Sequence, residues 1–192
     1  MMRKAALVAT CLTLFGGFTH AGWADDLPGI PPETVTDFLH SLIEADRTFY
    51  TIHVVERMQK HGSITASETW RTDKTTLPLP AQFLREANDL ATMTGTRVRV
   101  RLISHWPINP QNAPANDTER HTLEAVRQHP ERAATTTVKV DQQSYFQAIY
   151  ADRAVTQACI GCHNAHPRSP KHDFKMNDIM GGMVIEIPLN PQ

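Results

Sequence analysis

The sequence predicts an α+β domain in which helices pack around an antiparallel sheet. Two helical patterns occupy the first half of the chain, and one clearly alternating strand pattern with further short strand candidates follows them. Three to five antiparallel strands mixed with helices, in a chain of 192 residues, favour a covered sheet over a helical bundle.

The first 24 residues have the pattern of a secretory signal peptide. Arg3 and Lys4 precede an apolar stretch over residues 5–18, and small residues flank Trp23 at the two positions that signal peptidase reads. A retained membrane anchor is the weaker alternative, because the stretch is shorter than the roughly 20 residues of a spanning helix and a glycine pair interrupts it. We therefore expect export to the periplasm, no stable membrane insertion, and one domain over residues 25–192.

The charge balance excludes two classes of partner. Without Arg3 and Lys4, the 19 basic side chains fall to 17 against 20 acidic ones, a formal charge near −3 with histidines neutral. This balance indicates neither a nucleic acid nor an anionic membrane surface as the partner.

Two amphipathic helices are expected first. Apolar residues recur at three- or four-residue steps from Glu33 to Gly62, where the glycine is a natural C-cap, and a second helix is expected over residues 80–94, before Gly95. The expected buried stripe of the long helix contains Val35, Leu39, Leu42, Phe49 and His53, widened by Phe38, Ile43 and Tyr50. The expected buried side of the second helix contains Phe83, Leu84, Ala87, Leu90 and Ala91.

The sheet is expected from the segments that follow. Residues 98–104 alternate apolar side chains with Arg99 and Arg101, which is typical of a half-buried strand. A loop rich in proline and asparagine follows over residues 105–117, and then a short helix that Pro130 terminates. Further strands are expected over residues 135–140, 144–150 and 183–187.

The motif Cys159–Ile160–Gly161–Cys162–His163 carries the main functional signal. The pattern C-x-x-C-H is the attachment site of c-type haem, in which two thiols bond the porphyrin and the imidazole becomes the proximal iron ligand. On a helix, positions 159, 162 and 163 fall within an arc of roughly 100°, so all three groups can address one flat macrocycle. We expect one haem c, held by Cys159 and Cys162 and ligated by His163.

A disulfide or thiol redox centre is the alternative for the same cysteines, with a metal site a more remote one. A redox pair belongs at the N-terminus of a helix, where the helix dipole lowers the pKa of the first thiol. Residues 152–158 have a helical pattern, which predicts that the motif lies at a helix C-terminus, the wrong end for a thiolate. This expectation favours haem.

The chain resembles a family of exported single-haem proteins with a PAS-like fold. The resemblance is carried by residues 159–175 and 178–182, with further blocks at Tyr50–Thr51, Val54–Val55, and residues 77–85 and 104–109. It implies a haem-bearing PAS-like domain that occurs alone or as the extracytoplasmic sensing part of signalling proteins. Part of this family uses a thiolate as the distal iron ligand, but the third cysteine, Cys11, lies in the expected signal peptide.

Several residues compete for the sixth iron position, which can also remain open. Met180 follows a proline-containing loop long enough to bring its thioether to the opposite haem face, but a methionine there can equally fill core space. His53 and His61 on the long helix are candidates for bis-histidine ligation, or for ordinary hydrogen-bonded histidines. Met58 and Met93 are weaker candidates.

Other residues are candidates for the haem environment. Arg97 and Arg99, with Arg101, can hold the haem propionates by charge-assisted bonds, although such rows are more often the solvated side of a strand. Trp106 can pack on the porphyrin, and His166 can hydrogen-bond near the proximal ligand.

Three functional classes remain compatible with the sequence. A periplasmic electron carrier with a redox partner is the favoured expectation, because no output helix or kinase segment follows the domain and a sensor would need a separate signalling partner. A haem-based redox or gas sensor is the alternative. An enzyme such as a haem peroxidase has no positive support, because no nucleotide fingerprint or metal helix is present in the sequence.

Overall fold

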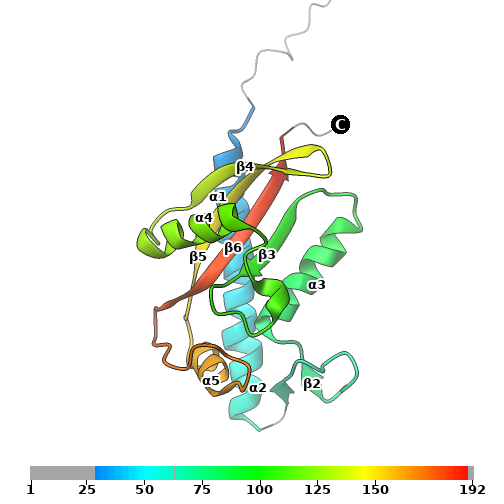
Figure 1. The fold of residues 1–192 in the computed structure, drawn as a ribbon. Helices are drawn as coiled ribbons and strands as arrows, with labels where there is room; N and C mark the ends of the chain where they lie inside the picture. Colours follow the sequence, from blue (N-terminus) through cyan, green and yellow to red (C-terminus); the bar gives the residue numbers. More distant parts are fainter. Residues whose placement is uncertain (1–28, 63, 190–192) are drawn as a thin grey trace, which may run out of the picture.

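A four-stranded antiparallel sheet forms the centre of the molecule. The computed structural model describes residues 29–62 and 64–189. The sheet has the order β3–β6–β5–β4, and its strands are β3 (Arg99–Ile103), β4 (Ala134–Val140), β5 (Gln143–Arg153) and β6 (Ile179–Pro188). The predicted antiparallel sheet with packed helices is thereby confirmed (Figure 1).

Helices cover both faces of this sheet. On one face, Met183 and Ile185 of β6 pack with Leu84 of α3 (Pro80–Thr92) and Leu39 of α1 (Pro32–Phe49). On the other face, Val184 of β6 packs with side chains of α4 (Asp117–Gln128). Neighbouring residues of β6 thus face opposite layers, as strand geometry requires.

The long N-terminal helix is continuous but changes its winding. After α1, a π-helical segment η1 spans Tyr50–Glu56, and α2 (Arg57–Lys60) completes the helix before Gly62. Figure 1 shows this helix running behind the sheet and beyond it, so that α2 lies beside α5 (Gln157–Ala165). The sequence predicts the helix but contains no signal for the π segment, a feature that is frequent at functional sites.

Short elements complete the lower part of the molecule. They are β1 (Thr65–Ala66), β2 (Thr76–Leu77) and the 3₁₀ turn η2 (Pro110–Asn112). Of the helices within residues 29–62 and 64–189, none is long and apolar enough to cross a membrane. The expected signal peptide over residues 1–24 lies outside the described residues.

Gly181 and Gly182 allow β6 to lie close to its neighbours. A Cβ atom on Gly181 would come within 2.2 Å of the Ile103 carbonyl oxygen in β3, and one on Gly182 within 2.7 Å of the Ile149 side chain. Both glycines are therefore required by close packing.

Two expectations about helix faces are wrong. Phe38, Leu42 and Phe49 of α1 are exposed, because the sheet contacts the side of the helix that carries Thr36, Leu39 and Ile43. Apolar residues occur on both sides of this helix, so periodicity does not determine which side is buried. In α3, which packs on the sheet through Leu84, the expected buried residues Ala87, Leu90 and Ala91 are exposed.

The expected helix over residues 152–158 is also wrong at its beginning. The β5–β6 ladder continues to Arg153, which pairs with Ile179, so residues 152 and 153 are strand. The helix α5 begins at Gln157, and the Thr156 hydroxyl caps it by accepting from the Cys159 amide at 3.4 Å. Cys159 therefore lies in the first turn of a helix rather than at its end.

Candidate functional site

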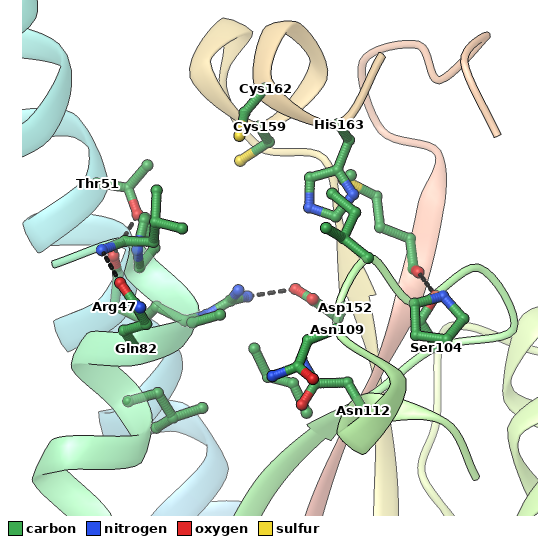
Figure 2. A pocket seen from close by; sticks show the side chains of 18 of the residues that line it. Arg47, Thr51, Gln82, Ser104, Asn109, Asn112, Asp152, Cys159, Cys162 and His163 are labelled. Carbon is green, nitrogen blue, oxygen red and sulfur yellow. Dashed lines mark hydrogen bonds and ion pairs between the residues drawn. The ribbon is translucent and has the colours of Figure 1, made fainter. Parts of the chain in front are cut away.

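The three residues of the attachment motif converge on one cavity. Helix α5 carries Cys159, Cys162 and His163, and all three line a cavity of about 660 Å³ between α5, the long helix, α3 and the loop after β3. Figure 2 shows the two thiols at one end of this cavity, Thr51 and Arg47 on one side and His163 on the other. This volume is typical of cofactor and small-ligand sites.

The His163 ring is held by its neighbours. It packs edge-on against Phe174, with ring centroids 5.8 Å apart and an interplanar angle of 88°. The side-chain amide of Asn164 fixes Phe174 in turn, donating to its carbonyl oxygen and accepting from its amide, both at 2.9 Å. The aromatic contact and the amide clamp together give the imidazole a defined orientation.

Burial keeps the imidazole neutral. It lowers the pKa of His163 from its usual 6.5, and Nδ1 is buried without a hydrogen-bond partner among the described residues. The neutral ring is the form that binds a metal. A buried nitrogen without a partner is costly in a closed core and is common where a bound group completes the site.

The thiols are free and Cys162 is not activated. Neither cysteine forms a disulfide, and desolvation raises the pKa of Cys162, with the Glu68 carboxylate and Cys159 adding to the effect. The position of Cys159 in the first turn of α5 is the position of the attacking thiol in a redox pair, so helix position no longer argues against a thiol oxidoreductase.

The wall across from His163 comes from the long helix. Three residues at steps of four line the cavity from this helix: Arg47 of α1, and Thr51 and Val55 of η1. Because a π turn is wider than an α turn, residues four apart remain on one side of the helix. The Thr51 hydroxyl donates to the Arg47 carbonyl oxygen at 2.7 Å. This wall offers the Thr51 hydroxyl, the Arg47 guanidinium, the Gln59 amide and apolar surface. No His, Met or Cys side chain is among the described residues of the long helix that line the cavity.

A half-buried ion pair crosses the cavity. The Arg47 guanidinium contacts the carboxylates of Asp152 on β5 and Glu44 on α1. These carboxylates raise the pKa of Arg47 against the effect of desolvation, so the charge is retained in spite of burial. The pair joins the long helix to the strand that leads into α5 (Figure 2).

A polar strap joins the loop between β1 and β2 to the segment after α5. Both Glu68 carboxylate oxygens accept from the Arg168 guanidinium at 2.7 Å, and the His166 ring nitrogen Nε2 lies 3.8 Å from Glu68. Glu68 and His166 line the cavity. These contacts close the cavity beside the thiols.

The structure brings only some of the predicted site residues to the cavity. Met180, Trp106 and His166 line it. Met180 is buried with Phe174, against which His163 packs, so the thioether belongs to the side of His163 and not to the wall across from it. Trp106 packs edge-on against Phe174, with ring centroids 5.8 Å apart.

Four predicted residues lie elsewhere. Among the residues that the structure describes, His53, His61, Arg97 and Arg99 are not part of the cavity lining. His53 is exposed and its ring is tilted by 41° against that of Phe49, with centroids 4.8 Å apart, and His61 is exposed just after α2. Arg99 pairs with Glu186 at 3.3 Å, and Arg97 is exposed. The wrong assignment of the helix faces accounts for His53. Arg101, the third arginine of the predicted row, does line the cavity, and its guanidinium contacts the Glu119 carboxylate of α4.

Sequence reasoning missed several residues of the site. Arg47, Glu68 and Asp152 bring charge to the cavity, while Thr51 and Phe174 shape its two sides. In the sequence, the only signal that Arg47 belongs to a site is that it is an arginine on the inner side of an amphipathic helix, and this signal is weak. Its partner, Asp152, lies 105 residues away, and no local pattern joins the two.

A family model matches most of the chain. The family model described as Tll0287-like matches residues 33–188. Among solved structures, the chain is similar to the cyanobacterial haem protein Tll0287, with 19% identity over 85% of this chain and 99% of that one, at a TM-score of 0.49. No curated protein matches the chain.

Proposed function

The chain belongs to the Tll0287-like family, and from that premise we propose that it is an exported protein that binds one haem c covalently. Cys159 and Cys162 would form the thioether bonds, and His163 would be the proximal ligand. The observation that carries this proposal is the convergence of both free thiols and the neutral imidazole, from one helix, on one cavity. Bound haem would supply an iron that changes oxidation state and accepts a sixth ligand.

The cavity has suitable surroundings for such a group. Apolar side chains such as Val55, Leu84 and Trp106 line it. Asn109 and Asn112 lie at the end away from the thiols (Figure 2), where amide groups can donate to carboxylates such as haem propionates. Within this proposal Phe174 orients His163, and Arg47 and Asp152 join the two sides of the cavity. The PAS-like fold and periplasmic location are part of the same proposal.

We propose sensing, by ligand binding at the iron, as the physiological role. The wall across from His163 presents Thr51 and Val55, neither of which is a strong iron ligand, and Met180 packs on the other side. An iron held by His163 alone would keep its sixth position available to a small ligand such as carbon monoxide or nitric oxide. This argument reverses the preference for electron transfer that the sequence suggests.

Electron transfer is the second candidate and has its own support. Cys162 lines the cavity and is exposed, so a group attached there would have one edge near the surface. A carrier needs that exposed edge and, for rapid exchange, a six-coordinate iron. The two roles therefore differ in what occupies the sixth position.

Absorption spectroscopy tests the proposal. Protein produced in a host that attaches haem c should be coloured and should retain a haem stain in a denaturing gel. If the sensing role is correct, the reduced protein binds carbon monoxide rapidly, with a shift of its main absorption band. A methionine-to-iron charge-transfer band in the oxidised protein, together with no reaction with carbon monoxide, would instead support the carrier.

A further inference from the structure

The polar strap spans the thiol end of the cavity. Glu68 belongs to the loop between β1 and β2, and Arg168 belongs to the segment after α5, 100 residues further along the chain. Glu68 lines the cavity. After desolvation, its carboxylate is the larger of the two influences that raise the pKa of Cys162, so it lies near this thiol. The strap therefore closes the cavity where the thiols lie.

The loop that carries Glu68 is anchored on α3. The Gln82 side chain donates to the Glu68 carbonyl oxygen at 3.0 Å and accepts from the Leu79 amide at 2.9 Å. The Arg71 guanidinium contacts the Glu86 carboxylate of α3. These contacts do not involve the Glu68 carboxylate, so they can keep the loop on α3 when the carboxylate leaves Arg168.

The ion pair at the centre of the strap is exposed. The Arg168 side chain is 58% exposed and the Glu68 side chain 44%. Exposed ion pairs are weak, because water solvates both charges when they separate. The pair of Arg47 with Asp152 lies deeper, with side chains 11% and 14% exposed. The strap can thus open while the inner pair still joins the walls of the cavity.

We propose that the polar strap is a gate at the thiol end of the cavity, which opens when Glu68 and Arg168 separate. The closed state is the one described above. The open state admits molecules to the cavity, so the strap limits the rate at which they enter. The opening is a property of the chain alone, whereas its effect on a ligand of the iron rests on the proposed function.

Thiol labelling of the haem-free protein measures the opening without any haem. Cys162→Ser leaves Cys159, which is half-buried and lines the cavity, as the single cysteine of residues 25–192. A bulky maleimide needs a wider opening than a small methanethiosulfonate does. Because both reagents react with the thiolate, the ratio of their rates cancels the ionised fraction of the thiol. The measured quantity is this ratio, bulky to small.

Substitution of either partner of the ion pair should open the gate. In the Cys162→Ser protein, Glu68→Gln and Arg168→Met should each raise the ratio about two- to fivefold, the effect expected from loss of an exposed ion pair. These substitutions change the charge near the thiol in opposite directions, so an increase in both reflects the lost contact. Arg127→Met is the matched control, because it removes an exposed pair with Glu124 on α4, away from the cavity lining. Circular dichroism establishes that each variant is folded.

A charge exchange tests whether the contact itself closes the cavity. Glu68→Arg places two cations together and should raise the ratio at least as far as Glu68→Gln does, whereas Glu68→Arg with Arg168→Glu should bring it back toward the starting value. High salt should raise the ratio when the ion pair is intact and leave Glu68→Gln unchanged. Equal ratios with and without Glu68→Gln and Arg168→Met, or a double variant as open as Glu68→Arg, would overturn the gate.

Carbon monoxide binding connects the gate to the proposed function. In reduced protein with both cysteines and bound haem, Glu68→Gln and Arg168→Met should bind carbon monoxide faster than the wild type, and Arg127→Met should bind it at the wild-type rate. Unchanged rates in variants with a raised labelling ratio would overturn the role of the gate in ligand entry. A protein without haem would overturn the proposed function and leave the labelling test of the gate intact.

Discussion

The imidazole of His163 packs edge-on against the ring of Phe174, at a centroid distance of 5.8 Å. Phe174 belongs to the segment after α5, and the side chain of Asn164 binds its backbone at both polar atoms. Its ring also contacts Trp106, so one aromatic residue joins the candidate ligand, the loop after β3 and the core beside Met180. The orientation of His163 depends on this cluster more than on any hydrogen bond.

Phe174→Ala should therefore affect both stability and the site. Loss of a buried phenyl ring costs about 3–5 kcal/mol of unfolding free energy. Phe38→Ala, which removes an exposed ring, should cost less than about 0.5 kcal/mol. Urea unfolding measures both. Equal effects of the two substitutions would contradict the packing described for Phe174.

Breaking the half-buried ion pair of Arg47 with Asp152 should cost more than breaking a surface pair. Asp152→Asn leaves the Arg47 guanidinium with a weaker partner in a half-buried position, and we expect a loss of about 1–3 kcal/mol. Arg127→Met, which removes the exposed pair with Glu124, should cost less than about 1 kcal/mol. Denaturant unfolding of the haem-free protein compares them. A smaller loss for Asp152→Asn than for Arg127→Met would show that the cavity pair is not structural.

Alanine substitutions at two glycines should change the stability of the protein in opposite directions. Gly181→Ala places a methyl group within 2.2 Å of the Ile103 carbonyl oxygen, which forces β3 and β6 apart and should cost about 1–3 kcal/mol. Gly161 lies within α5 with no atom within 4 Å of the added carbon, so Gly161→Ala should stabilise the helix by about 0.5–1 kcal/mol. Thermal melts of the haem-free variants provide the measurement. A destabilising Gly161→Ala would indicate that the cavity has no space at that point.

The haem-free protein should lose stability as the pH falls. Burial lowers the pKa of His163, and also of His40 and His105, below the usual 6.5, so the unfolded chain takes up protons before the folded one does. The stabilising effect is fully present above pH 6.5 and is lost as the pH falls through the lower folded pKa values. His163→Gln should reduce the slope of unfolding free energy between about pH 7 and 5. An unchanged slope in His163→Gln would contradict burial of a neutral imidazole.

A ligand supplied from the facing wall should close the sixth iron position. Thr51→His places an imidazole on the side of the cavity away from His163, and the reduced variant should bind carbon monoxide more slowly than the wild type. Thr51→Val, which keeps the size of the side chain without a ligand, is the control. If the wild type binds carbon monoxide slowly and Thr51→His does not change this rate, the wild-type iron already has a sixth ligand.

Local sequence patterns predict the helices and strands, whereas long-range packing determines where some of them end and which side of each is buried. The alternation beside Arg99 and Arg101 correctly predicts β3, because a strand face depends on neighbouring residues. The end of β5 was missed because its ladder with β6, through Arg153 and Ile179, outweighs a local helical pattern. The side of α1 that faces the sheet was not predictable from a helix that is apolar on both sides.

Part of the candidate site is likewise predictable from local sequence, and part depends on the fold. The motif around Cys159 and His163 is local and can be read directly from the sequence. Thr51 and Arg47 lie about a hundred residues before Asp152 and the motif. Only the fold brings these segments to one cavity, where Arg47 pairs with Asp152.

Extraction of the purified protein with acidified acetone tests the central claim most directly. Haem attached through Cys159 and Cys162 stays with the precipitated chain, and the intact mass exceeds that of the mature polypeptide by one haem. A double variant, Cys159→Ala with Cys162→Ala, should release any pigment into the solvent. A wild-type protein that is colourless after production in a competent host, or that loses its pigment to the acetone, would contradict covalent attachment.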